Sequence, residues 1–173
     1  TDGLLRVRVA ILGAGNRGVG AYGAYLLRRP DIAQLVAIAD PRSDRLQSAR
    51  IPHNVSPEHL YPSWEDLLRR ETDLDAIIIA TPDALHLGPA LAAMRSGVSI
   101  LLEKPICPTE PEVRRLLAAA RRRGADITVA HVLRYTPFFA RIKELLDRGV
   151  IGQLQTVRHT EHVVYWHFAP SSV

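Results

Sequence analysis

Near the start of the chain, a short apolar segment leads directly into a glycine-rich turn. The segment is Val7–Leu12, and residues 13–18 read GAGNRG, which is the pattern G-x-G-x-x-G. Between a strand and a helix, the first glycine permits a tight turn, the second lets a pyrophosphate approach the main chain, and the third lets the helix pack closely on the strand. Free N–H groups and a positive dipole at the helix start favour phosphate. The pattern predicts dinucleotide binding; its alternative is an ordinary glycine-rich loop.

A second apolar segment supports this interpretation. Residues 35–39 read as the next strand and end at Asp40, 22 residues after Gly18. A carboxylate at this place can accept hydrogen bonds from the ribose hydroxyls of an adenosine. Asp40 favours NAD over NADP because its charge repels a 2′-phosphate, but Arg42 could offset part of that repulsion, so use of NADP stays open. The alternative for Asp40 is a turn residue before Pro41.

Composition and charge exclude several classes of protein. The chain has 173 residues, enough for one sizeable domain or for one domain with a fragment of another, and its 47% hydrophobic and 23% charged residues are ordinary for a globular protein. The single cysteine, Cys107, permits no internal disulfide, and neither a secretory leader nor a membrane-length apolar run is visible. We therefore expect a cytoplasmic protein without a membrane partner. The net charge is +4, and most of the arginine clusters fall at expected helix ends without interleaved aromatic residues, so no nucleic-acid partner is expected.

Strand-like and helix-like segments alternate along most of the chain. Apolar cores at residues 75–80, 98–102 and 127–130 each read as a buried strand, and amphipathic helices separate them. This alternation predicts an α/β fold with a doubly wound parallel sheet, a Rossmann domain with helices on both faces.

The helix expected over residues 109–124 has the clearest boundaries. Thr109 and Glu112 match a capping box, and Gly124 closes the helix. The apolar stripe that should face the core consists of Val113, Leu116, Leu117 and Ala120.

Polar residues follow the expected strands at their carboxyl ends. In a parallel sheet these ends meet along one edge, where ligands bind beside the reversal in strand order. One cleft should therefore collect the residues that follow each strand: the glycine turn, Asp40, Thr81-Pro82, Glu103-Lys104-Pro105, and His131 with Arg134 and Tyr135.

The pattern changes after Gly152. Residues 153–168 have no helical stripe and are rich in Thr, Val and aromatic residues, which indicates a β-strand. An isolated strand cannot bury its faces, so we expect it to be the first strand of a truncated second domain of α+β type. Its unpaired edge would offer a surface for a homo-oligomer.

Four further segments, taken with the glycine pattern, resemble the Gfo/Idh/MocA family of glucose–fructose oxidoreductases, inositol 2-dehydrogenases and their relatives. They are Ala80-Thr81-Pro82-Asp83 with His86, Glu103-Lys104-Pro105, residues 131–135 (HVLRY) and residues 151–154 (IGQL). The resemblance covers roughly the whole chain. It implies a Rossmann domain that binds NAD or NADP, followed by an open antiparallel sheet that supplies much of the substrate pocket and the usual oligomer interface.

The resemblance also implies domain boundaries and roles. We expect an NAD(P)-binding domain over residues 1–131, a connecting helix over 132–150 and the start of a truncated substrate or oligomerisation domain over 151–173. Lys104 matches the lysine that hydrogen-bonds the reacting hydroxyl, and Pro105 matches a position that is often cis. The histidine that the family uses as general acid and base lies in the C-terminal domain, and its Asp…His pattern finds no match here.

These observations predict the cofactor-binding portion of an NAD(P)-dependent oxidoreductase that acts on a sugar or cyclitol hydroxyl, weakly active or inactive in this short form. The alternative is a non-catalytic dinucleotide-binding or partner-binding module. The expected catalytic residue is Lys104. The expected cofactor-binding residues are Gly13, Gly15, Asn16, Arg17, Gly18, Asp40, Arg42, Ala80, Thr81, Pro82, His86, Glu103 and Lys104. The expected substrate residues are His131, Arg134 and Tyr135.

Several of these residues have an ordinary alternative role. Lys104 could be a surface lysine paired with Glu103, Arg17 could lie in solvent, and His86 could be a polar residue at a helix end. Arg134 could join the two domains. No metal site is expected, because the two histidines at positions 53 and 59 have no cysteine partners in a proline-rich loop.

Overall fold

A computed structural model describes residues 6–162 of the chain. The chain divides after Ala130 into two units. Within the described residues, no helix combines the length and the apolar character needed to cross a membrane.

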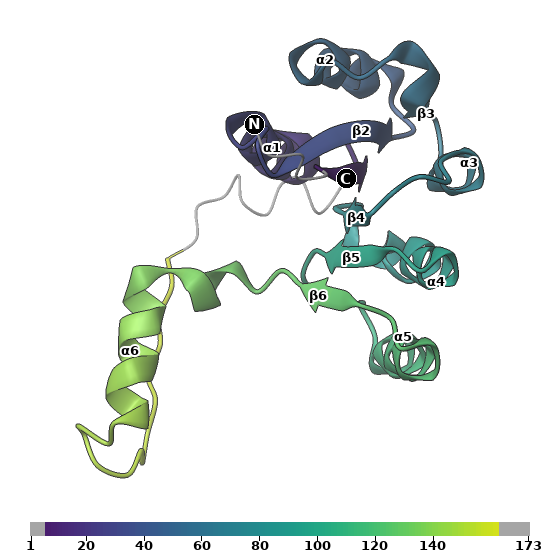
Figure 1. Ribbon diagram of the computed structural model, residues 1–173. Helices are drawn as coiled ribbons and strands as arrows, with labels where there is room; N and C mark the ends of the chain where they lie inside the picture. Colours follow the sequence, from purple (N-terminus) through teal and green to yellow (C-terminus); the bar gives the residue numbers. More distant parts are fainter. Residues whose placement is uncertain (1–5, 163–173) are drawn as a thin grey trace. The chain divides into compact units, whose positions relative to one another are not determined.

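The first unit is built on a six-stranded sheet in the order β3-β2-β1-β4-β5-β6 (Figure 1). All neighbouring strands are parallel. Because the strand order reverses between β1 and β4, the switch point of the sheet lies where β1 runs into the glycine turn. The predicted doubly wound, Rossmann-type α/β fold is confirmed. The strands are β1 (Val7–Leu12), β2 (Ala33–Ala39), β3 (Leu60–Tyr61), β4 (Ala76–Ile79), β5 (Ser99–Leu102) and β6 (Ile127–Val129).

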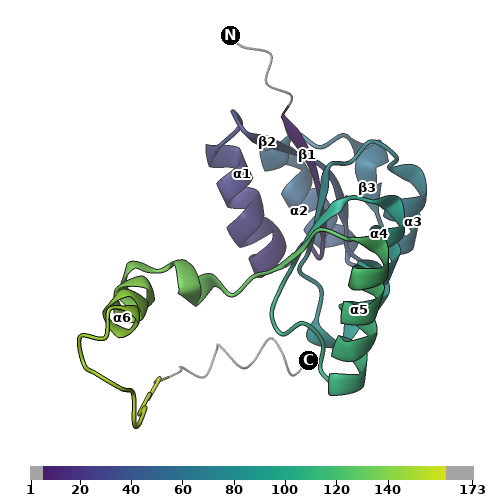
Figure 2. The same ribbon diagram turned by 60° about the horizontal axis from the view of Figure 1, so that its bottom comes forward.

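Helices cover both faces of the sheet, and alternate strand residues point to each side. Ala10 and Leu12 of β1 belong to a core formed with α3, α4 and α5, whereas Val9 and Ile11 belong to a second core formed with α1 and α2 (Figure 2). This two-sided burial explains why the strands read as continuous apolar runs. The helices are η1 (Asn16–Gly23), α1 (Ala24–Arg28), α2 (Ser43–His53), α3 (Trp64–Arg70), α4 (Leu87–Ser96) and α5 (Glu110–Arg123), with single turns η2 (Pro57–His59) and η3 (Asp83–Leu85).

Helix α5 shows how closely local signals set the boundaries. The Thr109 N–H donates to the Glu112 carboxylate at 3.2 Å, and the Thr109 side chain accepts a hydrogen bond from the Glu112 main-chain N–H, which is the predicted capping box. Gly124, with φ of +58°, ends the helix in the left-handed region. The predicted stripe is wrong at Leu117, which is 43% exposed, while Ala119 is buried instead. The buried residues of α5 are Leu116 and Ala119, so the helix face that packs against the core is narrower than the predicted apolar stripe.

Over residues 131–162, the second unit contains a 3-10 turn, η4 (Val132–Tyr135), and one helix, α6 (Pro137–Asp147). Residues 153–162 have no regular secondary structure and are exposed, so the strand expected over 153–168 is not formed there; residues 163–168 lie outside the described residues. A strand needs ladder hydrogen bonds to a neighbour, and no strand within residues 6–162 pairs with this segment. The strand edge expected to serve a homo-oligomer is therefore missing over 153–162.

Candidate dinucleotide-binding site

Two of the three glycines in the turn after β1 are required by packing. Gly13 has φ of +96°, and a Cβ on it would lie 2.5 Å from the Ala80 carbonyl oxygen. A Cβ on Gly18 would lie 1.9 Å from the Gly13 carbonyl oxygen. A larger residue at Gly18 would push η1 away from β1. A larger residue at Gly13 would push β1 away from the loop after β4.

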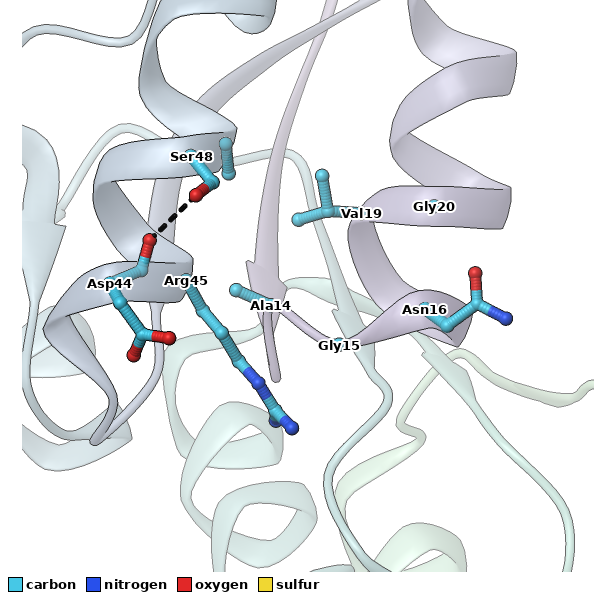
Figure 3. A pocket seen from close by; sticks show the side chains of 9 residues that line it. Ala14, Gly15, Asn16, Val19, Gly20, Asp44, Arg45 and Ser48 are labelled. Carbon is cyan, nitrogen blue, oxygen red and sulfur yellow. Dashed lines mark hydrogen bonds between the residues drawn. The ribbon is translucent and has the colours of Figure 1, made fainter. Parts of the chain in front are cut away.

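Gly15 is different, because neither its backbone nor its packing requires glycine. Its φ is −75°, and the nearest atom to a Cβ built on it is Arg45 Nη1 at 3.7 Å. The missing side chain opens onto a cavity of about 260 Å³ between η1 and α2 (Figure 3). The cavity is lined by Ala14, Gly15, Asn16, Val19, Gly20, Asp44, Arg45, Ser48 and Ala49.

This open approach to the main chain is the feature by which the site fits a pyrophosphate. The cavity lies at the start of a helix, where main-chain N–H groups and the helix dipole favour an anion. A Cβ at Gly15 would occupy the space over the turn. Packing and backbone conformation therefore explain the glycines at 13 and 18, and access for a ligand explains the glycine at 15.

Asp40, which follows β2, faces this turn as the spacing indicated. Its carboxylate is only 4% exposed, and Oδ2 accepts a hydrogen bond from Ala14 N at 2.8 Å while Oδ1 accepts one from Arg42 N at 2.9 Å. Arg45 Nη1 lies 3.8 Å from Oδ2. A carboxylate has about four acceptor positions, so capacity remains for a ribose hydroxyl. Asp40 also braces the glycine turn.

The basic residues near Asp40 are arranged differently from the expectation. The guanidinium of Arg42 pairs with Asp44 at 2.6 Å. Arg42 therefore contacts Asp40 through its main-chain N–H and not through its side chain. Arg45 extends from α2 past Ala14 into the cavity (Figure 3). Sequence reasoning missed Arg45; its position in the first turn of the helix that follows Asp40 was the available signal.

A second group of contacts joins the glycine-turn helix to the segment after β5. Glu103 is 6% exposed, and its Oε1 accepts a hydrogen bond from the Tyr22 hydroxyl at 2.5 Å and lies 3.3 Å from Arg17 Nε. Burial, and then the neighbouring carboxylate, raise the pKa of Tyr22. Tyr22 was missed because no local pattern marks a residue whose partner is 81 positions away. Arg17, expected at a phosphate, is half exposed and pairs with Glu103.

Lys104 presents its side chain to solvent from a well-held main chain. Its N–H donates to Glu103 Oε2 at 3.0 Å, and Glu103 N donates to the Ile79 carbonyl at 2.9 Å. No carboxylate within residues 6–162 forms an ion pair with the Lys104 ammonium, so the alternative of a surface pair with Glu103 is not what this structure shows. The Lys104–Pro105 peptide is cis, as the resemblance implied.

The loop after β4 holds the remaining residues expected at the cofactor. The Ala80 carbonyl lies against Gly13, Thr81 is partly exposed and Pro82 is exposed. His86, expected at the cofactor, has a fully buried side chain, with Nδ1 2.8 Å from the Pro105 carbonyl and Nε2 3.0 Å from the Thr81 carbonyl. Because both ring nitrogens face main-chain oxygens inside the unit, His86 does not present a surface to a cofactor.

The residues expected at the substrate belong to the second unit. His131 precedes η4, Arg134 and Tyr135 lie on it, and all three are exposed. Their contact with a substrate stays a prediction. Over the described part of the chain, no three His, Cys, Asp or Glu side chains gather in a way that could hold a metal ion.

Comparison with known proteins agrees with this geometry. Oxidoreductase P35 of Formosa agariphila is 31% identical over 95% of this chain and 54% of its own length. Inositol 2-dehydrogenase 4 of Saccharopolyspora erythraea is 31% identical over 85% of this chain and 43% of its own length. The chain thus spans about half the length of these curated relatives.

Solved structures show the same fold. A 3-ketoreductase from Actinomadura kijaniata, crystallised with TDP-benzene and NADP, superimposes with a TM-score of 0.71 at 28% identity over 86% of this chain and 44% of that one. The WlbA dehydrogenase from Bordetella pertussis, crystallised with NADH and UDP-GlcNAcA, gives a TM-score of 0.76 at 24% identity over 85% and 43%. The model of the oxidoreductase family with an NAD-binding Rossmann fold matches residues 7–131. The chain that carries this glycine turn therefore belongs to the Gfo/Idh/MocA family of oxidoreductases.

Proposed function

We propose that this chain is the cofactor-binding portion of an NAD(P)-dependent oxidoreductase that transfers hydride between nicotinamide and a sugar or cyclitol hydroxyl. The observation that carries the proposal is the open space over Gly15, where neither packing nor backbone conformation requires a glycine. A bound phosphate is the physical reason to keep this position free of a side chain.

Named residues have distinct roles in this proposal. The main chain of the glycine turn and the start of η1 hold the pyrophosphate, and Asp40 accepts a ribose hydroxyl. When bound, the nicotinamide supplies the hydride chemistry. The Lys104 ammonium donates a hydrogen bond to the reacting hydroxyl and stabilises the negative charge that develops on its oxygen.

The substrate class is supported by the relatives rather than by a pocket in this chain. The matched proteins include an inositol dehydrogenase and a 3-ketoreductase crystallised with a TDP derivative. We propose that a sugar or cyclitol hydroxyl meets Lys104, and that His131, Arg134 and Tyr135 contribute to its binding.

Calorimetric titration of the folded chain with NAD⁺ and with NADP⁺ tests the cofactor proposal. We expect saturable binding of NAD⁺ with one site per chain. A flat titration of both dinucleotides, under conditions where circular dichroism shows the folded α/β spectrum, would remove the proposal. Turnover with myo-inositol as a probe substrate is expected to be weak or absent for these 173 residues.

A further inference from the structure

His86 is the one histidine in the described residues whose side chain is completely buried. It lies directly before α4, and its ring bridges two main-chain carbonyls, those of Thr81 and Pro105. Buried polar groups in proteins are almost always hydrogen-bonded, so a ring with no exposed surface depends on these two partners. The Thr81 and Pro105 carbonyls both lie next to residues of the candidate site.

The two carbonyls belong to the loops that follow β4 and β5. Thr81 comes directly after Ala80, whose carbonyl lies against Gly13 of the glycine turn. Pro105 comes directly after Lys104. One buried ring therefore contacts both the loop that lies against the glycine turn and the segment that carries the proposed catalytic lysine.

The main chain of Lys104 is held on both sides. On its N-terminal side, Glu103 binds the Lys104 N–H and is itself fixed by Tyr22. On its C-terminal side, the nearest side-chain contact is that of His86 with the Pro105 carbonyl. The lysine side chain itself is exposed, so its reach is set by where these two contacts place its Cα.

A neutral imidazole carries one N–H and can donate to only one of the two carbonyls, whereas the doubly protonated ring donates to both. The shorter contact, at 2.8 Å, joins Nδ1 to the Pro105 oxygen. We propose that His86 is a positioning residue: its Nδ1–H donates to the Pro105 carbonyl and thereby fixes the main chain of Lys104. The value of this for hydride transfer rests on the proposed function, but the coupling of His86 to Lys104 can be tested without it.

Two conservative variants separate the two ring contacts. In His86→Asn the amide nitrogen lies near the place of Nδ1 and can still reach the Pro105 carbonyl. In His86→Gln it lies near the place of Nε2 and reaches the Thr81 carbonyl instead. If the contact with Pro105 is the one that matters, Asn should restore the properties of the unaltered chain and Gln should not.

The lysine content of the chain provides a direct reporter. Lys104 and Lys143 are its only lysines, so labelling with ¹⁵N-lysine gives two main-chain amide signals, one from the segment in question and one from α6 of the second unit. We expect His86→Gln to shift the Lys104 signal and leave the Lys143 signal in place, and His86→Asn to leave both near their original positions. A purely structural role predicts lower melting temperatures for both variants with an unshifted Lys104 signal, and this result would overturn the proposal.

Titration with NADH measures whether the variants also change cofactor affinity. We expect His86→Gln to bind NADH about ten-fold more weakly, equivalent to about 1.4 kcal/mol, and His86→Asn to stay within about two-fold of the unaltered chain. Equal affinities for both variants and the unaltered chain would contradict a positioning role. If the unaltered chain does not bind NADH at all, the proposed function fails, while the amide signals still decide whether His86 positions Lys104.

A measurement on the unaltered chain guards against variants that do not fold. Labelling with ¹⁵N-histidine distinguishes a protonated from an unprotonated ring nitrogen by chemical shift. A proton on Nδ1 of His86 supports the proposal. A proton on Nε2 alone would place the hydrogen bond on Thr81 and overturn it.

Discussion

The glycine turn and the Glu103–Lys104–Pro105 segment both follow strands of the same sheet, yet different contacts hold them. In the turn, main-chain atoms lie so close together that Gly13 and Gly18 have no room for a side chain. The second segment is held by side chains from elsewhere in the chain: Tyr22 from η1, and His86 from the start of α4.

This difference determines how each region responds to mutation. The glycine turn is sensitive to added atoms, because close-packed main chain cannot move aside without shifting a strand or a helix. The lysine segment is sensitive to lost donors, because a buried carboxylate or carbonyl without its partner is costly. Variants in the two regions test this contrast.

Gly18→Ala should have the largest effect on folding. The new Cβ would lie 1.9 Å from the Gly13 carbonyl oxygen, so η1 and β1 must separate. We expect the free energy of unfolding to fall by about 3 kcal/mol, measured by urea denaturation. Gly15→Ala is the matched control, and equal stabilities for the two variants would contradict the packing argument.

Gly15→Ala should leave folding intact and abolish most dinucleotide binding. Its backbone conformation suits alanine, so stability should be unchanged or about 0.5 kcal/mol higher. The methyl group would project toward the cavity where the pyrophosphate is proposed to lie, and we expect NAD⁺ affinity to drop about a hundred-fold, or about 2.7 kcal/mol. Affinity equal to that of the unaltered chain, measured by calorimetry, would show that the cavity over Gly15 is not the phosphate site.

Tyr22→Phe tests the side-chain contacts of the lysine segment. The variant removes the hydroxyl that donates to the buried Glu103 carboxylate at 2.5 Å, and we expect a loss of about 1 kcal/mol in the free energy of unfolding. Tyr25→Phe, three residues further along and 48% exposed, is the control and should change stability little. If both variants unfold at the same urea concentration as the unaltered chain, Glu103 does not depend on Tyr22.

The smallest expected effect concerns the packing of α2 against the glycine-turn helix. His53 is buried at the end of α2, with its ring against Gly23, and burial lowers its pKa below the ordinary 6.5. The unfolded chain then binds a proton at this residue before the folded chain does. Stability from His53 is therefore fully present above pH 6.5 and is lost as the pH falls from there through the lowered value.

Comparison with His53→Gln isolates this term from the other histidines. The stability difference between the two proteins, measured by urea denaturation from about pH 8 to about pH 5, should change in favour of the variant at the acidic end. A difference that stays constant over this range would show that His53 titrates alike in the folded and unfolded chains.

Much of the fold could be predicted because its signals are local. The capping box at Thr109, the helix end at Gly124, and the apolar runs of the strands all lie within a few residues of the structure they specify. The predictions failed where an element depends on a distant partner. Residues 153–162 have strand-like composition, but no strand among residues 6–162 pairs with them, and the apolar side chain of Leu117 is 43% exposed.

The amino-acid sequence by itself determined the parallel α/β fold, the glycine turn and the position of Asp40, because periodicity and spacing act over short stretches of chain. Only the tertiary structure decided what Glu103, Tyr22 and His86 do. Their partners are brought close by the order of strands in the sheet, and hydrogen bonds between distant positions leave no periodic trace in the sequence. His86 shows the difference most clearly: its residue type indicated a polar group near the site, and its burial between two carbonyls placed it beneath the site instead.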